Sequence, residues 1–378
     1  MFKAAQAAST NYSTTFKAYA KVNLVHSVSY PPENGYHAVQ TIFQPIDLYD
    51  TLHFYWSHES IDSSATKATT KLGTCVHISC KPAECAPIPA EYLTSIEKLP
   101  CKENLIFKAI DLMEQRFQKA FAPEEMLSLQ NSTQCSQESL QRLPPQKPQS
   151  TKSAPQDAMN EVFIQVEKAI PAGGGLGGGS SDAACVIKAY AQVHNIDPCS
   201  KECIEVAQAL GSDVAGFLYE NATWMCGKGD TLKKQLPNFC LPIVLMGSSE
   251  GNSTAEIYAS FDENPQIIAA VEDYVQTLMQ AAQSVHQNQS LIAPNNDKAL
   301  ALAQACSNNL QKAACSKNKQ LALNIEHAMT DENVLNALVA GSGSSSFAIC
   351  ATQEAAQRFT NKAQQFCDWA CIVHGSFV

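Results

Sequence analysis

The chain has 378 residues, enough for a sizeable core and for two domains of ordinary size. Hydrophobic residues make up 45% and charged residues 16%, which predicts a folded protein and excludes a disordered acidic chain. The net charge of −10 argues against a broad nucleic-acid-binding surface. Phosphate would therefore have to be bound by a local device, such as a glycine loop or a helix end.

Targeting signals are weak in this sequence. Lys3 and Lys17 precede the first acidic residue, Glu33, faintly like a transit peptide, but strand-like sequence has begun by Phe16. No apolar run approaches the ~18 residues of a membrane span. We therefore expect a cytoplasmic protein with no membrane partner and no nucleic-acid partner.

The cysteines are numerous but do not form a recognisable framework. There are 15 among 378 residues, an odd count below that of a disulfide scaffold, and no C-x-x-C pair occurs. A zinc site built from Cys75, Cys80, Cys85 and Cys101 is conceivable, but these spacings match no zinc finger or ribbon. The spacing favours buried, reduced thiols.

The first third of the chain reads mostly as strands. Apolar and β-branched residues predict extended segments at 16–29, around Ile42 and Phe43, and at 51–56. Apolar residues at helical spacing predict a helix over 104–117. Residues 128–160 are rich in Gln, Ser and Pro and poor in apolar residues, so we expect a disordered surface insertion there.

The rest of the chain alternates between strand and helix patterns. A strand at 161–166 is followed by a glycine loop, a helix at 181–193 and a second helix at 199–210. An apolar strand at 241–246 opens a second domain. The elements expected after it are helices around 265–285 and 297–314 and a strand at 346–350.

The glycine loop is the most informative segment, with six glycines in the seven positions 173–179. Without Cβ atoms, its N–H groups can turn toward an anion and approach it closely, and the following helix adds free N–H groups. Ser180 and Ser181 supply hydroxyls and a helix cap. Polyphosphate is the natural ligand, and a flexible linker is the plainer alternative. The candidate binding residues are Pro171, Ala172, Gly173, Gly174, Gly175, Leu176, Gly177, Gly178, Gly179, Ser180 and Ser181.

Two well-known phosphate loops do not fit this segment. No Lys-Ser or Lys-Thr pair ends it, so it is not a Walker A loop. Gly173, Gly175 and Gly178 satisfy G-x-G-x-x-G, but the acidic partner of a dinucleotide fold could only be Asp197. Asp197 lies in a turn before Pro198 and not at the end of a second strand, so the dinucleotide interpretation fails.

A second motif match points to a hydrolase. Gly247 to Gly251 fits the G-x-S-x-G nucleophile elbow, with Ser249 as the nucleophile. No helix follows the match directly, which favours a serine-rich loop at a strand end. The triad partners available downstream are Asp297 or Asp331 and His327 or His374.

Three separated segments together resemble the motifs of the GHMP kinases, which phosphorylate small-molecule hydroxyls with ATP. They are Ala20-Lys21-Val22-Asn23-Leu24, the glycine loop and Ala340-Gly341-Ser342-Gly343-Ser344-Ser345. Further segments are similar to the branch whose substrate is 4-diphosphocytidyl-2-C-methyl-D-erythritol, in the non-mevalonate isoprenoid pathway. These are Gly35-Tyr36-His37, Gln40 to Gln44, Asp47 to Thr51, and Leu210-Gly211-Ser212-Asp213-Val214.

The resemblance implies an α+β fold of two domains with the active site in the cleft between them. Residues 12–235 would form the ATP-binding domain, of the ribosomal protein S5 domain 2-like kind, and 236–378 a ferredoxin-like closing domain. ATP and Mg²⁺, bound as the nucleotide complex, would be the cofactors. The implied partner is the cytidine diphosphate methylerythritol substrate, and the chain would be a monomer or weak homodimer.

The resemblance also implies residue roles. Asp213 would accept the proton of the attacking hydroxyl, with Lys21 as electrostatic support, and no protein side chain is assigned to a metal. The plainer alternatives are a turn aspartate and a solvated lysine. Asn104 would lie on the adenine side, where a helix N-cap would look identical. The substrate residues would be Asn23, Tyr36, His37, Thr254 and Tyr258, with Tyr36 and Tyr258 stacked on the two faces of the cytosine. The loop closing on the phosphates would be Gly341, Ser342, Gly343 and Ser344.

Some features depart from the family pattern or leave other functions open. Asp182 directly follows the serines, and its charge is tolerable beside phosphates only if it faces solvent or Mg²⁺. Residues 57–99 have no assignable purpose. The alternatives are a GHMP kinase acting on mevalonate, homoserine or a sugar, and a nucleotide-binding protein without catalysis.

Overall fold

The structure is a computed structural model that describes residues 12–33, 35–56, 65–93, 101–117, 161–239, 242–286 and 296–375. The insertion expected at 128–160 lies outside the described residues. Among the described helices, none combines the length and the apolar character needed to cross a membrane.

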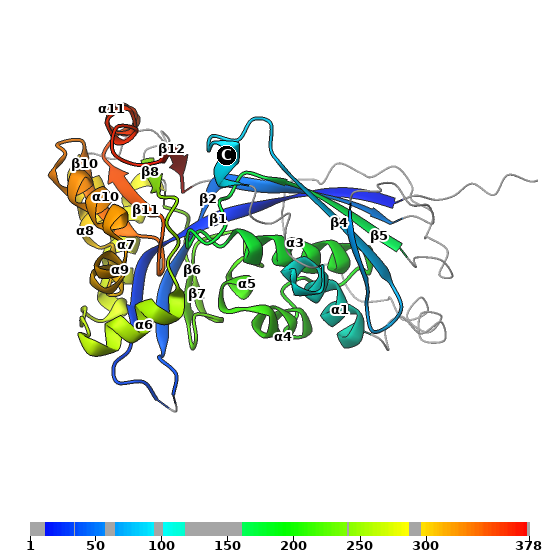
Figure 1. Ribbon diagram of the computed structural model, residues 1–378. Coiled ribbons are helices and arrows are strands. Elements are labelled where there is room, and N and C mark those ends of the chain that lie inside the picture. Colours follow the sequence, from blue (N-terminus) through cyan, green and yellow to red (C-terminus); the bar gives the residue numbers. More distant parts are fainter. Residues whose placement is uncertain are drawn as a thin grey trace, which may run out of the picture.

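A large sheet of eight strands forms one half of the molecule (Figure 1). Its main path runs β3-β4-β5-β2-β1-β9, and β6 and β7 extend it from β2. The second strand is a single strand of 18 residues, because the two apolar segments predicted separately around Ile42 and at 51–56 are continuous. The strands are β1 (Tyr12–Val28), β2 (Val39–Trp56), β3 (Thr66–Thr69), β4 (Cys75–Pro82), β5 (Glu161–Lys168), β6 (Thr223–Cys226), β7 (Thr231–Gln235) and β9 (Ser307–Asn308).

Helices cover one face of this sheet (Figure 1). Strand residues such as Phe54 and Ile164 pack against helix residues such as Ile106 and Val186 in one buried apolar cluster. This burial follows from the strand period of two and the helix period of 3.6 in the sequence. The helices are α1 (Leu105–Phe117), α3 (Gly178–Val193), α4 (Lys201–Leu210) and α5 (Ser212–Gly216), with the short turns η1 (Ala90–Tyr92) and η3 (Cys101–Glu103).

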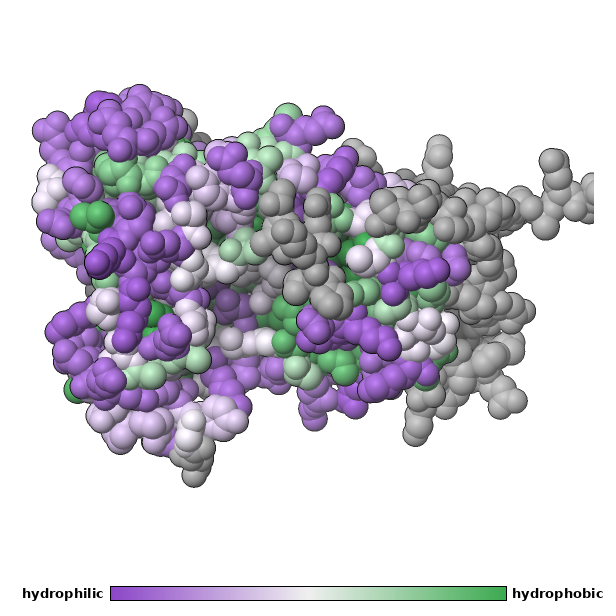
Figure 2. Space-filling model, in the orientation of Figure 1, coloured by the Kyte–Doolittle hydropathy of each residue, from purple (hydrophilic) through white to green (hydrophobic). Residues whose placement is uncertain are grey.

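A second sheet of four antiparallel strands has the order β10-β11-β8-β12. Its strands are β8 (Pro242–Gly247), β10 (Val334–Val339), β11 (Ser346–Cys350) and β12 (Trp369–His374). The helices of this half are α6 (Thr254–Glu263), α7 (Val271–His286), α8 (Asn296–Gln304), α9 (Gln311–Lys317), α10 (Lys319–Thr330) and α11 (Gln353–Ala363). On the face drawn in Figure 2, hydrophilic side chains cover most of the surface over these helices, and apolar ones are scattered. The two sheets with their helices form the α+β arrangement that the sequence predicts.

The single helix predicted at 297–314 is wrong, because the chain leaves the helix after Gln304 and forms β9 beside β1 of the large sheet. Asn308 Nδ2 donates to the carbonyl oxygens of Val339 and Gly341, both at 2.8 Å. Asn309 Nδ2 donates to Val28 O at 2.8 Å. Asparagine side chains that bond backbone elsewhere compete with helix formation. One strand of the predicted second domain therefore belongs to the large sheet, and the division at 235/236 stays a prediction.

The helix predicted at 265–285 is shorter, since α7 begins at Val271. A helix that was not predicted, α6, precedes it. The Ser253 hydroxyl caps α6 by accepting from the N–H of Glu256 at 3.5 Å. This cap separates a short amphipathic helix from the serine-rich loop after β8, and it brings Thr254 and Tyr258 onto one helix.

Candidate functional site

A cavity of about 510 Å³ lies where the glycine loop meets segments of both halves of the chain. Its first wall is the loop from Pro171 to Ser180, with the buried side chains of Lys168 and Asp182 beside it. The other residues that line it are Lys21, His26, Glu103, Asn104, Leu105, Ile170, Ser212, Asp213, Asn252, Thr254, Tyr258, Leu310, Gly341, Ser342 and Gly343.

The glycine loop has the backbone of an anion cradle. Gly173, Gly175 and Gly177 have φ values of +73°, +76° and +76°, which L side chains rarely adopt. The helix α3 begins at Gly178, three residues before the predicted start, and its N-cap Gly177 offers no side chain. The prediction of a serine cap is therefore wrong, and Ser181 is buried inside the first turn. The N–H groups at the start of this 16-residue helix keep their capacity to bind phosphate.

The loop also packs closely on the segment 340–345. The Ser345 N–H donates to Gly174 O at 3.1 Å, and a Cβ on Gly175 would lie 2.0 Å from Ala340 O. Gly341, Ser342 and Gly343 line the cavity, whereas Ser344 is buried and turns its N–H toward Gly173 O at 3.4 Å. Some of the glycines are thus required by backbone contact as well as by any ligand.

Lys21 and Asp213 form an ion pair on the cavity wall. Lys21 Nζ lies 3.3 Å from Asp213 Oδ2 and donates to Asn23 Oδ1 at 2.8 Å. Only 3% of Lys21 is exposed, so the alternative of a solvated strand lysine is wrong. The Lys21 N–H donates to Leu176 O at 3.0 Å, which fixes β1 against the glycine loop. Asp213 stands in the first turn of α5, where its side chain is about one third exposed.

His26 lies in the same cavity and was not predicted. Strand alternation would place Lys21 and His26 on opposite faces of β1, five residues apart, but a bulge between Asn23 and Val25 inserts one extra residue. His26 Nδ1 is buried and has no hydrogen-bond partner among the described residues. Burial, with the nearby Lys21 charge, lowers the pKa of His26 to about 4, so the imidazole is neutral. No feature of the sequence marks the position of the bulge.

Three further predicted residues reach the cavity. Asn104 lines it, and Asn104 Oδ1 also accepts from the N–H of Ile106 at 2.9 Å, so the residue caps α1 as well. Thr254 and Tyr258 enter from α6, one helical turn apart. Thr254 Oγ1 lies 3.0 Å from Ser342 Oγ, which links α6 to the 341–343 segment.

Asn23, Tyr36 and His37 do not line the cavity. Both ends of the Asn23 amide are used, because it accepts from Lys21 and donates to Thr41 Oγ1 at 2.8 Å. Tyr36 is 62% exposed, with Lys228 Nζ 4.0 Å from its ring centre. His37 Nδ1 donates to Ser29 O at 2.7 Å, and its ring centre lies 5.4 Å from that of Tyr258. The ring beside Tyr258 is therefore His37, and a base held between Tyr36 and Tyr258 stays a prediction.

Asp182 faces neither solvent nor an open metal position, contrary to the expectation. It is 3% exposed, and Lys168 Nζ donates to Asp182 Oδ2 at 2.8 Å and also to Asp50. Asp50 Oδ1 accepts from the N–H groups of Ala169 and Ile170 at 2.6 and 2.9 Å. Burial raises the pKa of the Asp182 carboxyl, although Lys168 opposes the shift. This buried cluster fixes the end of β5 where the glycine loop starts.

A hydrolase site is not assembled at Ser249 from the described side chains. Both ring nitrogens of His374 are occupied, by Asp47 Oδ2 and Gln353 Oε1 at 2.9 Å each. His327 stacks on Phe366 with ring centres 4.5 Å apart. Asp331 is paired with Lys362 at 2.7 Å, and the Asp297 side chain lies outside the described part of the chain.

Comparison with known proteins points to one family of kinases. The profile of the GHMP kinases N terminal domain matches residues 149–221, which include the glycine loop and Asp213. The 4-diphosphocytidyl-2-C-methyl-D-erythritol kinase of Nostoc sp. (strain PCC 7120) is 25% identical over 92% of this chain and 90% of its own. The enzyme of the same name from Clostridium kluyveri is 27% identical over 88% of this chain and 89% of its own.

Solved structures share the fold. A crystal structure of 4-(cytidine 5'-diphospho)-2C-methyl-D-erythritol kinase superposes with a TM-score of 0.58, at 21% identity, over 96% of this chain and all of the other. Homoserine kinase from Cytophaga hutchinsonii gives a TM-score of 0.54 at 14% identity, over 99% of this chain and 96% of its own. The predicted α+β fold is confirmed over nearly the full chain. The chain is therefore similar to the GHMP kinases in the profile of its glycine-loop region, in relatives that align over about nine tenths of its length, and in its fold.

Proposed function

We propose that the protein transfers the γ-phosphoryl group of ATP to the 2-hydroxyl of 4-diphosphocytidyl-2-C-methyl-D-erythritol. The observation that carries this proposal is the ion pair of the buried Lys21 with the partly exposed Asp213, 3.3 Å apart, in the same cavity as the glycine loop. Relatives named for this reaction align over about nine tenths of the chain, which supports the choice of substrate.

The glycine loop and the start of α3 would hold the ATP phosphates, and Asn104 would lie beside the adenine. The loop fits this ligand, since its positive-φ glycines and uncapped helix end supply N–H donors without side chains in the way. Mg²⁺ would enter with ATP and neutralise charge on the transferred phosphoryl group. Ser180, which lines the cavity beside the loop, offers an oxygen ligand of the kind Mg²⁺ prefers.

Asp213 would act as the base. It would accept the proton of the substrate hydroxyl while the hydroxyl oxygen bonds to the γ-phosphorus of ATP. At the same time, the bond between the γ-phosphorus and the β–γ bridging oxygen would break, and ADP would leave. Asn23 would hold the Lys21 ammonium group beside the negative charge that develops on the transferred phosphoryl group. Asn23 would therefore act as a positioning residue, in place of the substrate contact that the resemblance implies.

The substrate would be recognised on the side of α6. Tyr258 supplies an aromatic face and Thr254 a hydroxyl at the cavity wall, and His37 packs beside Tyr258. His26 would add one neutral imidazole to the wall of this cavity. An aromatic face beside a hydroxyl and an imidazole suits a flat base next to a polyol.

The test is ADP release with ATP, Mg²⁺ and the cytidylyl substrate, with mevalonate and homoserine in parallel. We expect turnover with the cytidylyl compound alone. Turnover with another alcohol would keep the kinase and reject the substrate, and ATP binding without turnover would favour a non-catalytic binder.

The role of Asp213 is tested separately. Asp213→Asn should lower kcat by about 10²–10⁴-fold, the usual contribution of a general base, and leave the Kd for ATP nearly unchanged. Asp230→Asn is the matched control, because Asp230 lies in the β6–β7 turn and does not line the cavity. Equal activity in the two variants would remove Asp213 from the mechanism.

A further inference from the structure

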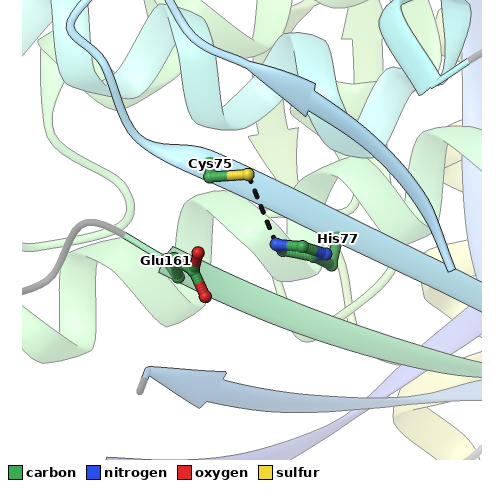
Figure 3. A group of neighbouring side chains, drawn as sticks. All are labelled: Cys75, His77 and Glu161. Atoms are coloured by element: carbon green, nitrogen blue, oxygen red, sulfur yellow. Dashed lines mark hydrogen bonds between the residues drawn. The ribbon is translucent and has the colours of Figure 1, made fainter. Parts of the chain in front are cut away.

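Three side chains with metal-binding atoms meet at the start of β4 and β5, away from the cavity (Figure 3). Cys75 and His77 lie on β4, and Glu161 is the first residue of β5. Their ligand atoms all lie within 4.8 Å of one another. The glycine loop follows the other end of β5, roughly 23 Å along the strand at 3.3 Å per residue.

The sheet itself brings the three side chains together. Cys75 and His77 are two residues apart, so both point to the same face of β4. Cys75 is paired with Glu161 in the parallel register, which places the carboxylate on that face as well. Val76 and Val162 belong to the apolar cluster under the helices, so the three ligands face the opposite side of the sheet. Figure 3 shows the thiol and the carboxylate near the same end of the imidazole ring.

The spacing suits a tetrahedral metal ion. Cys75 Sγ lies 3.3 Å from His77 Nε2, and a tetrahedral zinc with usual bond lengths would hold sulfur and nitrogen about 3.5 Å apart. The His77 ring is held by stacking on Phe163, with ring centres 4.2 Å apart and 19° between the planes. Among the described residues, no ion pair and no side-chain hydrogen bond involves the Glu161 carboxylate.

We propose that Cys75, His77 and Glu161 form a zinc site that clamps β4 to β5. On binding, the Cys75 S–H bond would break, its proton would leave to solvent, and an S–Zn bond would form. Thiolate and carboxylate would then balance the two positive charges of the ion. A water molecule would take the fourth position, because Cys75 and Glu161 are only partly buried.

This site differs from the four-cysteine alternative considered from the sequence. Cys75 and Cys80 are five residues apart on one strand and so point to opposite faces, and Cys85 is exposed beyond the strand end. Of the four thiols, only Cys75 contributes. The partners that complete the site, a histidine two residues on and a glutamate 86 positions later, have no zinc-motif spacing.

The experiment uses the full chain, stripped of metal with a chelator. Zn²⁺ is titrated in competition with a chromophoric chelator, and Co²⁺ is used as a spectroscopic probe. We expect one equivalent of either ion and a thiolate-to-cobalt charge-transfer band. Cys75→Ser should abolish the band, and Glu161→Gln should weaken zinc binding about tenfold or more. Cys85→Ser, the matched control with an exposed thiol, should change neither.

Zinc should also raise the Tm of the wild-type chain and of Cys85→Ser, and leave the Tm of Cys75→Ser unchanged. If Cys75→Ser does not fold, zinc binding by Glu161→Gln still provides the test, because Glu161 is only partly buried. Absence of zinc binding by the wild-type chain would overturn the proposal. So would a charge-transfer band that survives in Cys75→Ser, or zinc affinity that is equal in Glu161→Gln and wild type.

Discussion

Replacing Gly175 by alanine adds one methyl group at the contact between the glycine loop and the 340–345 segment. The new Cβ would lie 2.0 Å from Ala340 O, where ordinary contact begins at 3.4 Å, so one backbone must retreat by about 1.4 Å. The φ of +76° adds about 1–2 kcal/mol of backbone strain for an L side chain. The forced separation of two packed segments adds about 1–3 kcal/mol.

Gly173→Ala is the matched control. Gly173 has nearly the same φ, +73°, but a Cβ there meets nothing within 4 Å. Backbone strain alone should lower the free energy of unfolding of Gly173→Ala, by about 1–2 kcal/mol. The assay is urea unfolding without nucleotide, so that contact with ATP does not enter the comparison.

Hydrogen exchange localises the effect, because the Ser345 N–H donates to Gly174 O in the folded protein. Its exchange should accelerate in Gly175→Ala and stay unchanged in Gly173→Ala. Equal loss of stability in the two variants, or unchanged protection of Ser345 in Gly175→Ala, would refute the close contact between these segments.

Two further predictions concern buried charge. Lys168→Met would leave Asp50 and Asp182 buried without their cation. It should therefore lower the free energy of unfolding, measured in urea melts, by about 3–5 kcal/mol. The control Lys81→Met removes an exposed ion pair and should change the free energy of unfolding little. His26 has its pKa lowered from 6.5 to about 4, so below pH 6.5 the unfolded chain takes up a proton that the folded chain does not. The free energy of unfolding of the wild-type chain should therefore fall by up to about 3 kcal/mol between pH 6.5 and 4. This fall should be missing in His26→Leu, and a pH profile of unfolding equal to that of the wild type would contradict this cause.

The sequence predicts the parts of the site that depend on local pattern. Six glycines between a strand and a helix can be interpreted without a structure, because glycine is the residue that positive φ requires. Lys21 and Asp213 come from the family resemblance, and the structure adds only their proximity. His26 could not be predicted, since its place in the cavity depends on a bulge in β1 that pattern alone does not reveal.

Long-range pairing explains the other misses. Asn308 and Asn309 end a helix because of carbonyl groups at Val339, Gly341 and Val28, which are distant in the sequence. The burial of Asp182 depends on Lys168, 14 residues earlier, and on Asp50 from a different strand. Interactions of this kind are fixed by the assembled fold and leave no local signal.

The attachment of β9 to β1 limits how this protein can open. Val25 and His26 on β1 pair with Ser307 and Asn308, so the half that carries Tyr258 is joined to the strand that carries Lys21. Swinging the two halves apart as rigid bodies would break these backbone hydrogen bonds. Access for substrate and release of ADP must instead come from movement of short segments at the rim, such as 252–254 and 341–343, over a fixed frame.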